Sequence, residues 1–215
     1  MKRYLVVCVA LLAGVAVRAQ ELKNLFVNMP DSLAPLLTKV NREDFGDFLE
    51  GGMKAEVKDR FGGKAEMLRL TDNYLLLKET AMSTVEMTLL PVNDSVNVIC
   101  VVHTCQAPVA DSRVAFYSVR WESLPTADFV SLPVEDDFYP TTVQAETDAM
   151  RNLRREADML LMKASLSATS DSLSFVYTTP DYLEKEKGEQ LRNYVRKVPV
   201  AYSWKDGKFR REGGE

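Results

Sequence analysis

The chain has 215 residues, 46% of them hydrophobic and 27% charged, with a formal net charge of −4. This amount of apolar material excludes a disordered tail, and a chain of this length needs no metal or disulfide to fold. The length indicates one domain or two small ones. Composition alone indicates no activity.

The first 19 residues have the features of a cleaved signal peptide. Lys2 and Arg3 precede an apolar run over 4–17, and small residues at Val17 and Ala19 occupy the positions that signal peptidase reads. The alternative is an N-terminal membrane anchor, but the run is shorter than the roughly 20 residues that span a bilayer. We therefore expect cleavage after Ala19, no membrane span in the mature protein, and a periplasmic or extracellular location.

Two further expectations follow from the leader. Cys8 lies inside it with no cleavage point before it, so we expect a protein that is not a lipoprotein. Removing residues 1–19 takes away three of the 27 basic residues and no acidic one, which leaves 24 against 31 and a charge of −7. The two short basic clusters, 151–155 and 192–197, have acids nearby and are typical of solvated helix faces, so we expect no nucleic-acid partner.

The segment before residue 64 has helical periodicity. Apolar residues at helical spacing predict a first helix over 29–40, and Asn41 is a candidate cap for a second helix that ends at Gly51 and Gly52. A short third helix is expected around Met53, Val57 and Phe61.

From Lys64 the hydrophobic period changes to two, which predicts strands. Five strands between 64 and 121, joined by short connections, indicate an antiparallel meander. The strand 84–90 alternates, with Thr84, Glu86 and Thr88 expected on a wet face. The strand 96–105 is apolar on both sides and is expected at the centre of the sheet.

The remaining chain predicts a connection and a second group of elements. Residues 122–146 hold three prolines and no sustained period, which indicates a long loop. A short helix is expected over 147–157, a hairpin over 159–166 and 173–178, a helix opening at Thr179 and Pro180, and a last strand from Val200 with a turn at Asp206-Gly207. The predicted class is α+β with a mainly antiparallel sheet; we expect 20–121 and 147–215 to pack as one globular unit.

Cys100 and Cys105 are the cysteines of the mature chain. In an exported protein they would normally be suspected of pairing. Five residues of strand, however, separate their Cα atoms by about 16 Å and place the side chains on opposite faces, whereas a disulfide spans at most about 7 Å. We predict two unpaired thiols.

Known catalytic and metal-binding patterns are missing from this sequence. His103 is the single histidine and lies mid-strand, which is typical of a partly buried strand residue whose ring nitrogens find partners. Of Cys100, His103 and Cys105, only the last two share a face, and two ligands do not make a zinc site. No phosphate loop or dinucleotide motif occurs. We expect neither cofactor nor metal.

The densest acid cluster outside the predicted helices is Glu135, Asp136 and Asp137, followed by Phe138 and Tyr139. Such a run can hold calcium, but the alternating ligands and glycine of a calcium loop are missing, which favours a solvated or helix-capping run. Because periodicity does not force burial here, we expect the two aromatics to be exposed and to mark a contact surface. These five residues are the candidate binding site; no catalytic residue is identified.

Several segments carry a resemblance to a known family: 26–33 (FVNMPDSL), 36–38, 41–42, 53–57 (MKAEV), 70–72, 83–87 (STVEM), 111–113, 158–164 (DMLLMKA) and 178–180. The sequence resembles the Bacteroidales domain-of-unknown-function family 3256, over nearly the whole mature chain. The resemblance implies an exported bacterial protein and supplies no activity, ligand or catalytic residue.

Two functional hypotheses follow. The first is a soluble, non-catalytic binding module of the periplasm or cell envelope, with an envelope protein or a small molecule as its partner. The alternative is a hydrolase that uses a divalent metal held by the carboxylates near Glu135 to Asp137.

Overall fold

The computed structural model of the protein describes residues 22–140 and 147–213. The expected signal peptide at 1–19 and positions 141–146 of the expected connection lie outside this part of the chain. The architecture is mixed α+β, with two antiparallel sheets as its main components, as the change of period from 3.6 to 2 predicted.

The larger sheet has seven strands that follow one another in chain order. This order means that each strand pairs with its neighbours in sequence, so short turns are sufficient connections. The strands are β1 (Glu56–Lys58), β2 (Lys64–Leu70), β3 (Tyr74–Lys78), β4 (Ser83–Asn93), β5 (Val96–Cys105), β6 (Asp111–Ser118) and β7 (Ser123–Leu124). The predicted five-strand meander is confirmed as β2 to β6. The strand β5, expected at the centre of the sheet, is an interior strand between β4 and β6 that is buried on both sides, whereas the middle position belongs to β4.

The smaller sheet has four strands in the order β11-β10-β9-β8. They are β8 (Met162–Leu166), β9 (Ser172–Tyr177), β10 (Val200–Lys205) and β11 (Lys208–Arg211). The predicted turn at Asp206-Gly207 joins the last two: both residues have positive φ, 51° and 76°, as the central residues of a tight hairpin turn require.

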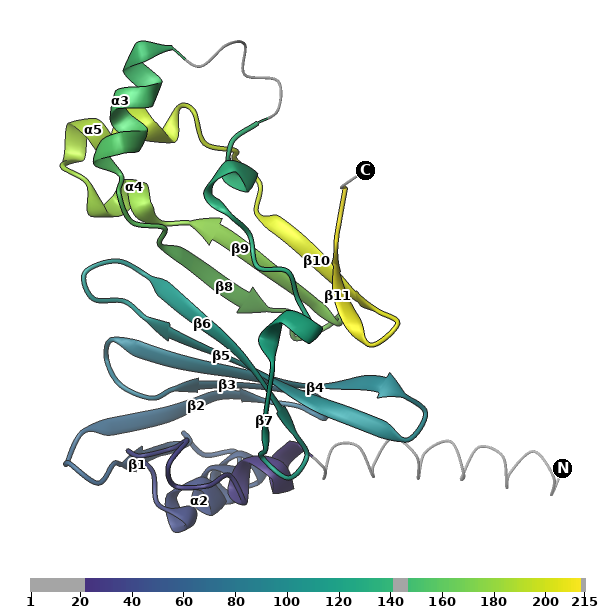
Figure 1. The fold of residues 1–215 in the computed structure, drawn as a ribbon. Helices are drawn as coiled ribbons and strands as arrows, with labels where there is room; N and C mark the ends of the chain where they lie inside the picture. The colour runs from purple at the N-terminus through teal and green to yellow at the C-terminus, as the bar shows by residue number, and fades with distance from the viewer. Residues whose placement is uncertain (1–21, 141–146, 214–215) are drawn as a thin grey trace, which may run out of the picture.

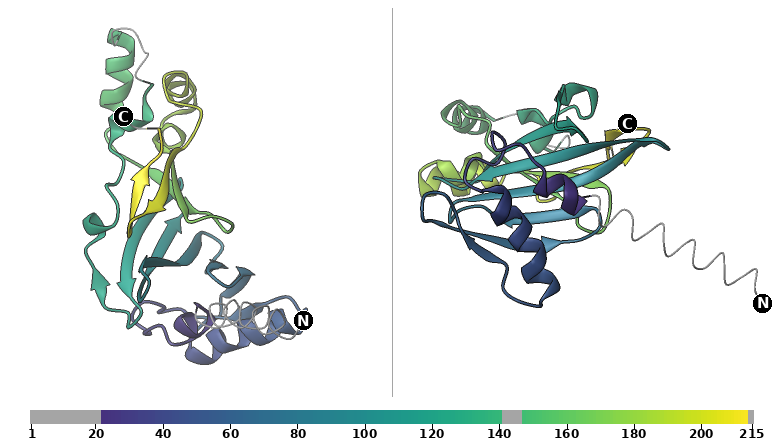
Figure 2. Two further views of the ribbon diagram at one scale, coloured as in Figure 1. Left: turned by 90° about the vertical axis from the view of Figure 1, so that its right-hand side faces the viewer. Right: turned by 90° about the horizontal axis from the view of Figure 1, so that it is seen from below.

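Three layers result (Figures 1 and 2). One face of the larger sheet carries the helix α2 (Lys39–Glu50) and the helical residues 22–27, with a core that includes Leu22, Phe45 and Met87. The other face packs against the smaller sheet, through a core that includes Phe116 and Phe175. The helices α3 (Asp148–Glu156), α4 (Thr179–Tyr182) and α5 (Lys185–Arg192) gather at one end of the smaller sheet.

Covering both faces of the larger sheet changes the environment of β4. The expected wet face of this strand is wrong: Glu86 is 7% exposed and Thr88 4% exposed. Alternation identified the two faces correctly, since Val85 and Met87 pack toward α2. Alternation of one strand cannot reveal that a second sheet, almost 80 residues later in the chain, covers the polar face.

Two of the three N-terminal helices were predicted wrongly. Residues 29–37 are not helical and contain turns at 31–33 and 35–36, because Pro35 cannot continue a helix from the preceding residues. The true helix α2 begins later, with Thr38 as its N-cap and Asn41 as the reciprocal partner in a capping box. The region around Val57 is the short strand β1, which pairs with β2 and buries Val57 while Glu56 and Lys58 face outward.

The helix predicted from Thr179 is broken. It forms α4 and α5, separated at Leu183, and α5 ends at Arg192 before the expected apolar positions at 194–198. Thr178, not Thr179, is the N-cap. The Thr179 hydroxyl instead donates to Met159 O at 2.7 Å and accepts from Leu161 N–H at 2.9 Å, which attaches the helix to the start of the β8 strand.

Both cysteines of the described residues are free, so the prediction of unpaired thiols is confirmed. Cys100 is buried between the two sheets, where burial raises the pKa of its thiol, and Cys105 is exposed at the end of β5.

A thiol-alkylation experiment measures this difference. In a folded chain that comprises residues 20–215, iodoacetamide is expected to modify Cys105 within minutes and to leave Cys100 unmodified, because the reactive species is the accessible thiolate. Unfolding without reductant is expected to give two added groups by mass spectrometry. Cys105→Ser serves as the control and should give none when folded and one when unfolded; an unmodified wild-type chain after unfolding would contradict the assignment.

Candidate functional site

The predicted acid run forms a short 3-10 helix, η2 (Glu135–Phe138), in the stretch of chain that connects β7 of the larger sheet to β8 of the smaller sheet. Two of its carboxylates bind the same arginine of α3. Arg154 Nε donates to Glu135 Oε1 at 2.9 Å, and Arg154 Nη2 donates to Asp136 Oδ1 at 2.6 Å. The cluster 151–155, expected as a solvated helix face, therefore supplies the arginine that attaches α3 to η2.

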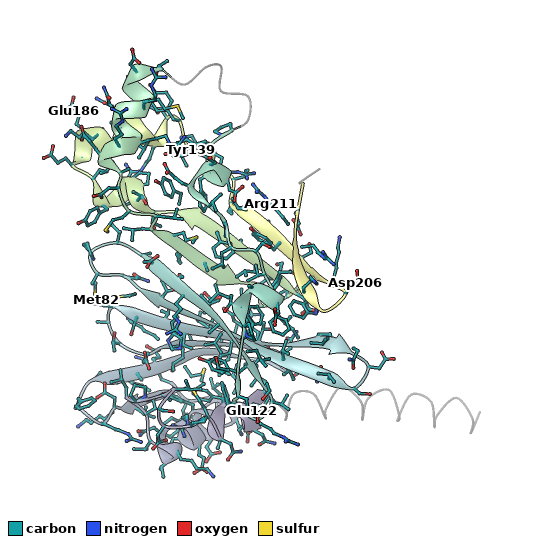
Figure 3. The ribbon with its side chains drawn as sticks, viewed as in Figure 1. Met82, Glu122, Tyr139, Glu186, Asp206 and Arg211 are labelled. Atoms are coloured by element: carbon teal, nitrogen blue, oxygen red, sulfur yellow. The ribbon has the colours of Figure 1, made fainter. Side chains whose placement is uncertain are left out.

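The third carboxylate, Asp137, points to the smaller sheet. One oxygen accepts from Val134 N–H at 2.8 Å, and the other forms an ion pair with Arg211 of β11. Figure 3 shows Tyr139 beside α3 and Arg211 on the last strand, so the acid run connects two elements that are far apart in sequence. Carboxylate oxygens that already accept hydrogen bonds from arginine side chains are poorly suited to bind a metal cation. Across 22–140 and 147–213, no group of three His, Cys, Asp or Glu residues is arranged to hold a metal ion.

The expected exposure of Phe138 and Tyr139 is wrong. Phe138 is 1% exposed and Tyr139 9% exposed. Both rings pack on Tyr177 of β9, with centroids 5.1 and 6.2 Å away, and Arg154 lies 4.5 Å from the Tyr139 ring centroid. Their burial comes from tertiary contacts, which local periodicity does not report. Binding by the five predicted residues stays a prediction, and Asp137 is the member that lines a concave, open surface.

That open surface is a groove at the free edge of the smaller sheet, which we call the β11 groove. It has a volume of about 340 Å³ and lies between β11 and the segment that follows the 3-10 helix η1 (Thr126–Asp128). Its lining residues are 127–132, Asp137, Tyr202 and 208–211.

Two hydrogen bonds fix the walls of the β11 groove. Phe209 N–H donates to Phe129 O at 2.7 Å, which joins β11 to the segment 127–132 at one point. Tyr202 Oη donates to Ser131 O at 2.9 Å. Burial raises the pKa of Tyr202, so its hydroxyl stays protonated and keeps this donor role. The walls are therefore preformed, which lowers the entropy lost when a ligand binds.

Charge is distributed unevenly around the groove. Arg211 is paired with Asp137, whereas Lys208 and Arg210 are exposed and have no ion pair within the described part of the chain. The remaining lining acid is Asp128. The groove thus presents two unpaired cations and exposed peptide groups, an arrangement that can bind an anionic or hydrogen-bonding partner.

Sequence reasoning did not identify most of this site. The alternation in β11 is visible in the sequence, because Phe209 is apolar and its neighbours are basic. The missing information was which loop lies beside β11. That pairing joins residues about 80 positions apart and depends on the packing of both sheets.

His103 is partly buried on β5, as predicted, and burial lowers its pKa. No other residue within 22–140 and 147–213 supplies the predicted partner of a ring nitrogen, and neither nitrogen is buried without a partner. His103 lies on the larger sheet and does not line the β11 groove.

Comparisons with known proteins identify a family and give no activity. A family described as "Protein of unknown function (DUF3256)" matches residues 14–209. Among solved structures, a domain of an uncharacterized protein from Porphyromonas gingivalis W83 is similar, with a TM-score of 0.80 and 31% sequence identity over 89% of this chain and 99% of that one. No curated protein matches. None of the helices within 22–140 and 147–213 combines the length and apolarity required to cross a bilayer.

Proposed function

The chain belongs to the DUF3256 family of proteins of unknown function, and we propose that this member is an exported, non-catalytic binding module of the periplasm or cell envelope whose partner occupies the β11 groove. The observation that carries the proposal is the groove itself: a preformed opening of about 340 Å³ at the edge of a sheet, with unpaired cations and peptide groups on its wall. Binding sites are typically concave, with a few placed polar groups.

Export is proposed from the leader sequence, with its basic start, its apolar run and its cleavage position after Ala19. The alternative metal-dependent hydrolase gains no support from the geometry near η2, because Arg154 and Arg211 bind the three carboxylates that it would need.

Site-specific photo-crosslinking in the bacterial host tests the proposal. A benzoylphenylalanine placed at Leu132, which lines the groove and is 43% exposed, is expected to give one discrete adduct in the periplasmic or envelope fraction. The adduct should carry a mature chain that begins at Gln20. The matched position is Phe61, which is 80% exposed on the turn between β1 and β2 and does not line the groove.

Adduct formation at 132 and not at 61 would support the proposal. Equal labelling at both positions would indicate random collisions, and no adduct at 132 would contradict a partner in the groove. Recovery of an unprocessed chain from the cytoplasm would contradict the export part separately.

A further inference from the structure

The two edges of the smaller sheet differ in their accessibility. At the β8 edge, three alternate N–H groups donate to side chains of the larger sheet: Met162 to Asp111 Oδ1 at 3.2 Å, Ala164 to Ser112 Oγ at 2.9 Å and Leu166 to Glu86 Oε2 at 2.9 Å. These side chains occupy the donors that a further strand would use. Proteins commonly block sheet edges in this way to prevent unwanted pairing.

The β11 edge is not blocked in this way. Trp204 N–H donates to Asp171 O at 2.8 Å, so the peptide groups of Trp204 face β9 and not β11. Phe209 lies opposite Trp204 in the antiparallel pair of β10 and β11. The peptide groups of Phe209 therefore point away from β10, toward the free edge of the sheet. Arg211, two residues later and opposite Tyr202, also directs its peptide groups toward the free edge. The segment 127–132 uses Phe209 N–H, while Phe209 O, Arg211 N–H and Arg211 O have no hydrogen-bond partner among residues 22–140 and 147–213.

The side chains next to these groups are basic. Lys208 and Arg210 lie on one face of β11, since alternate residues of a strand share a face. Lys205, directly opposite Lys208, adds a third exposed cation. Glu212, the next residue on this face, accepts a hydrogen bond from Ser203. None of the three cations has an ion pair in the described residues, although the whole chain is acidic.

This charge pattern selects between possible partners. If two copies of β11 paired with each other, Lys208 and Arg210 of each copy would face the same cations of the other, and like charges across a strand pair are destabilising. An extended segment with acidic residues at alternate positions would instead place a carboxylate beside each cation. Its main chain would pair with Phe209 O and Arg211 N–H.

We propose that the β11 edge binds an extended, acidic segment of a partner protein by strand addition, with main-chain hydrogen bonds to Phe209 and Arg211 and carboxylates beside Lys208 and Arg210. This inference rests on the proposed function and specifies the chemistry of its partner. Strand addition takes its affinity from main-chain bonds and its specificity from alternate side chains.

The first experiment uses a defined probe with the full mature chain. The probe is a capped peptide, Thr-Val-Glu-Val-Glu-Val-Thr-Thr, and binding is followed by fluorescence anisotropy and by amide hydrogen exchange. We expect slower exchange at Arg211 N–H in the complex. A peptide with Gln in place of both Glu is expected to bind about tenfold more weakly, because it loses two cross-strand ion pairs. A peptide N-methylated at alternate amides should not bind.

Matched variants of the protein locate the interaction. Lys208→Glu combined with Arg210→Glu is expected to weaken binding of the acidic peptide at least about tenfold. Lys163→Glu is the control, because Lys163 is an exposed lysine of β8, the opposite edge strand of the same sheet. It should leave the affinity unchanged. Circular dichroism verifies that both variants are folded.

Four results would overturn the inference: no binding of the acidic peptide, equal binding of the N-methylated peptide, equal loss in the Lys163→Glu control, or a dimer that the double variant abolishes. The proposed function has a separate readout. If the adduct at Leu132 forms in the double variant as in the wild type, the groove binds a partner but not by this mechanism. If the wild-type protein gives neither peptide binding nor an adduct at Leu132, both proposals are contradicted.

Discussion

Replacing Arg42 with alanine is expected to lower the free energy of unfolding by about 3–5 kcal/mol, the range for breaking a buried charged interaction. Arg42 is 3% exposed. Its guanidinium donates to Leu37 O at 2.9 Å, to Met29 O at 2.8 Å and to Val27 O at 3.2 Å. Removing the donors leaves carbonyl groups of the N-terminal segment without partners, and each such loss costs about 1–3 kcal/mol when the group is buried.

The geometry also predicts that lysine is a poor substitute. A single ammonium cannot reach three carbonyls that diverge around a planar guanidinium, so Arg42→Lys is expected to recover less than half of the loss. Asp31, which pairs with Arg42 at 3.2 Å and with Arg60 at 2.6 Å, has a largely exposed side chain. Hydrogen bonds from Arg60 and then Arg42 lower its pKa. Asp31→Asn should therefore have a small effect.

Urea denaturation at pH 7 measures these differences. Arg120→Ala is the matched control, because Arg120 is exposed and has no ion pair in the part of the chain described here; a change within about 0.5 kcal/mol is expected. If Arg42→Ala loses less than about 1 kcal/mol, the carbonyl groups do not depend on the guanidinium.

The role of Arg42 also explains one limit of sequence-based prediction. Residues 29–40 have helical spacing of apolar residues, yet the carbonyls of Met29 and Leu37 accept from Arg42 and not from a helical N–H four residues later. Apolar periodicity indicates which side chains face the core. It does not indicate that the backbone carbonyls of the segment accept hydrogen bonds from a side chain instead of from helical N–H groups. The segment 26–33 that carries the family resemblance is thus organised by a buried arginine.

The meander of β2 to β6 was predictable because its information is local. Each strand of β2 to β6 pairs with its sequence neighbour, so alternation and turn residues were sufficient, and the free thiols of Cys100 and Cys105 followed from strand geometry. The candidate site was not local. Asp137 was predicted as a site residue, but its partner Arg211 lies 74 positions later in the chain. Contacts of this kind depend on how two sheets pack, which no single segment encodes.

Glu86 is expected to make the stability of the protein depend on pH in the direction opposite to that of most carboxylates. Its carboxylate lies between the two sheets, where Oε2 accepts from Leu166 N–H at 2.9 Å and from Tyr74 Oη at 3.0 Å. Burial raises its pKa above the ordinary value of 4.5, and the two hydrogen bonds oppose this shift only in part.

The sign of the effect follows from proton binding. Between pH 4.5 and the raised pKa, the folded protein holds a proton that the unfolded chain has released, so stability decreases as pH rises. The contribution is complete below pH 4.5 and is lost as pH rises through the folded pKa. Glu86→Gln does not titrate and keeps polar atoms beside Leu166 and Tyr74. Its stability relative to the wild type should therefore increase as pH rises from 4.5 to 8.

Glu86→Ala separates the hydrogen bonds from the charge. It leaves Leu166 N–H and the Tyr74 hydroxyl without an acceptor between the sheets, and we expect it to lower the free energy of unfolding by about 2–4 kcal/mol at pH 5. Urea denaturation between pH 4 and 8 measures both variants, with Glu189→Gln as a control at an exposed position of α5. A wild type whose pH dependence matches that of Glu86→Gln would show that Glu86 does not titrate abnormally. A mild loss in Glu86→Ala would mean that β8 is held against the larger sheet by its other two side-chain contacts, those of Asp111 and Ser112.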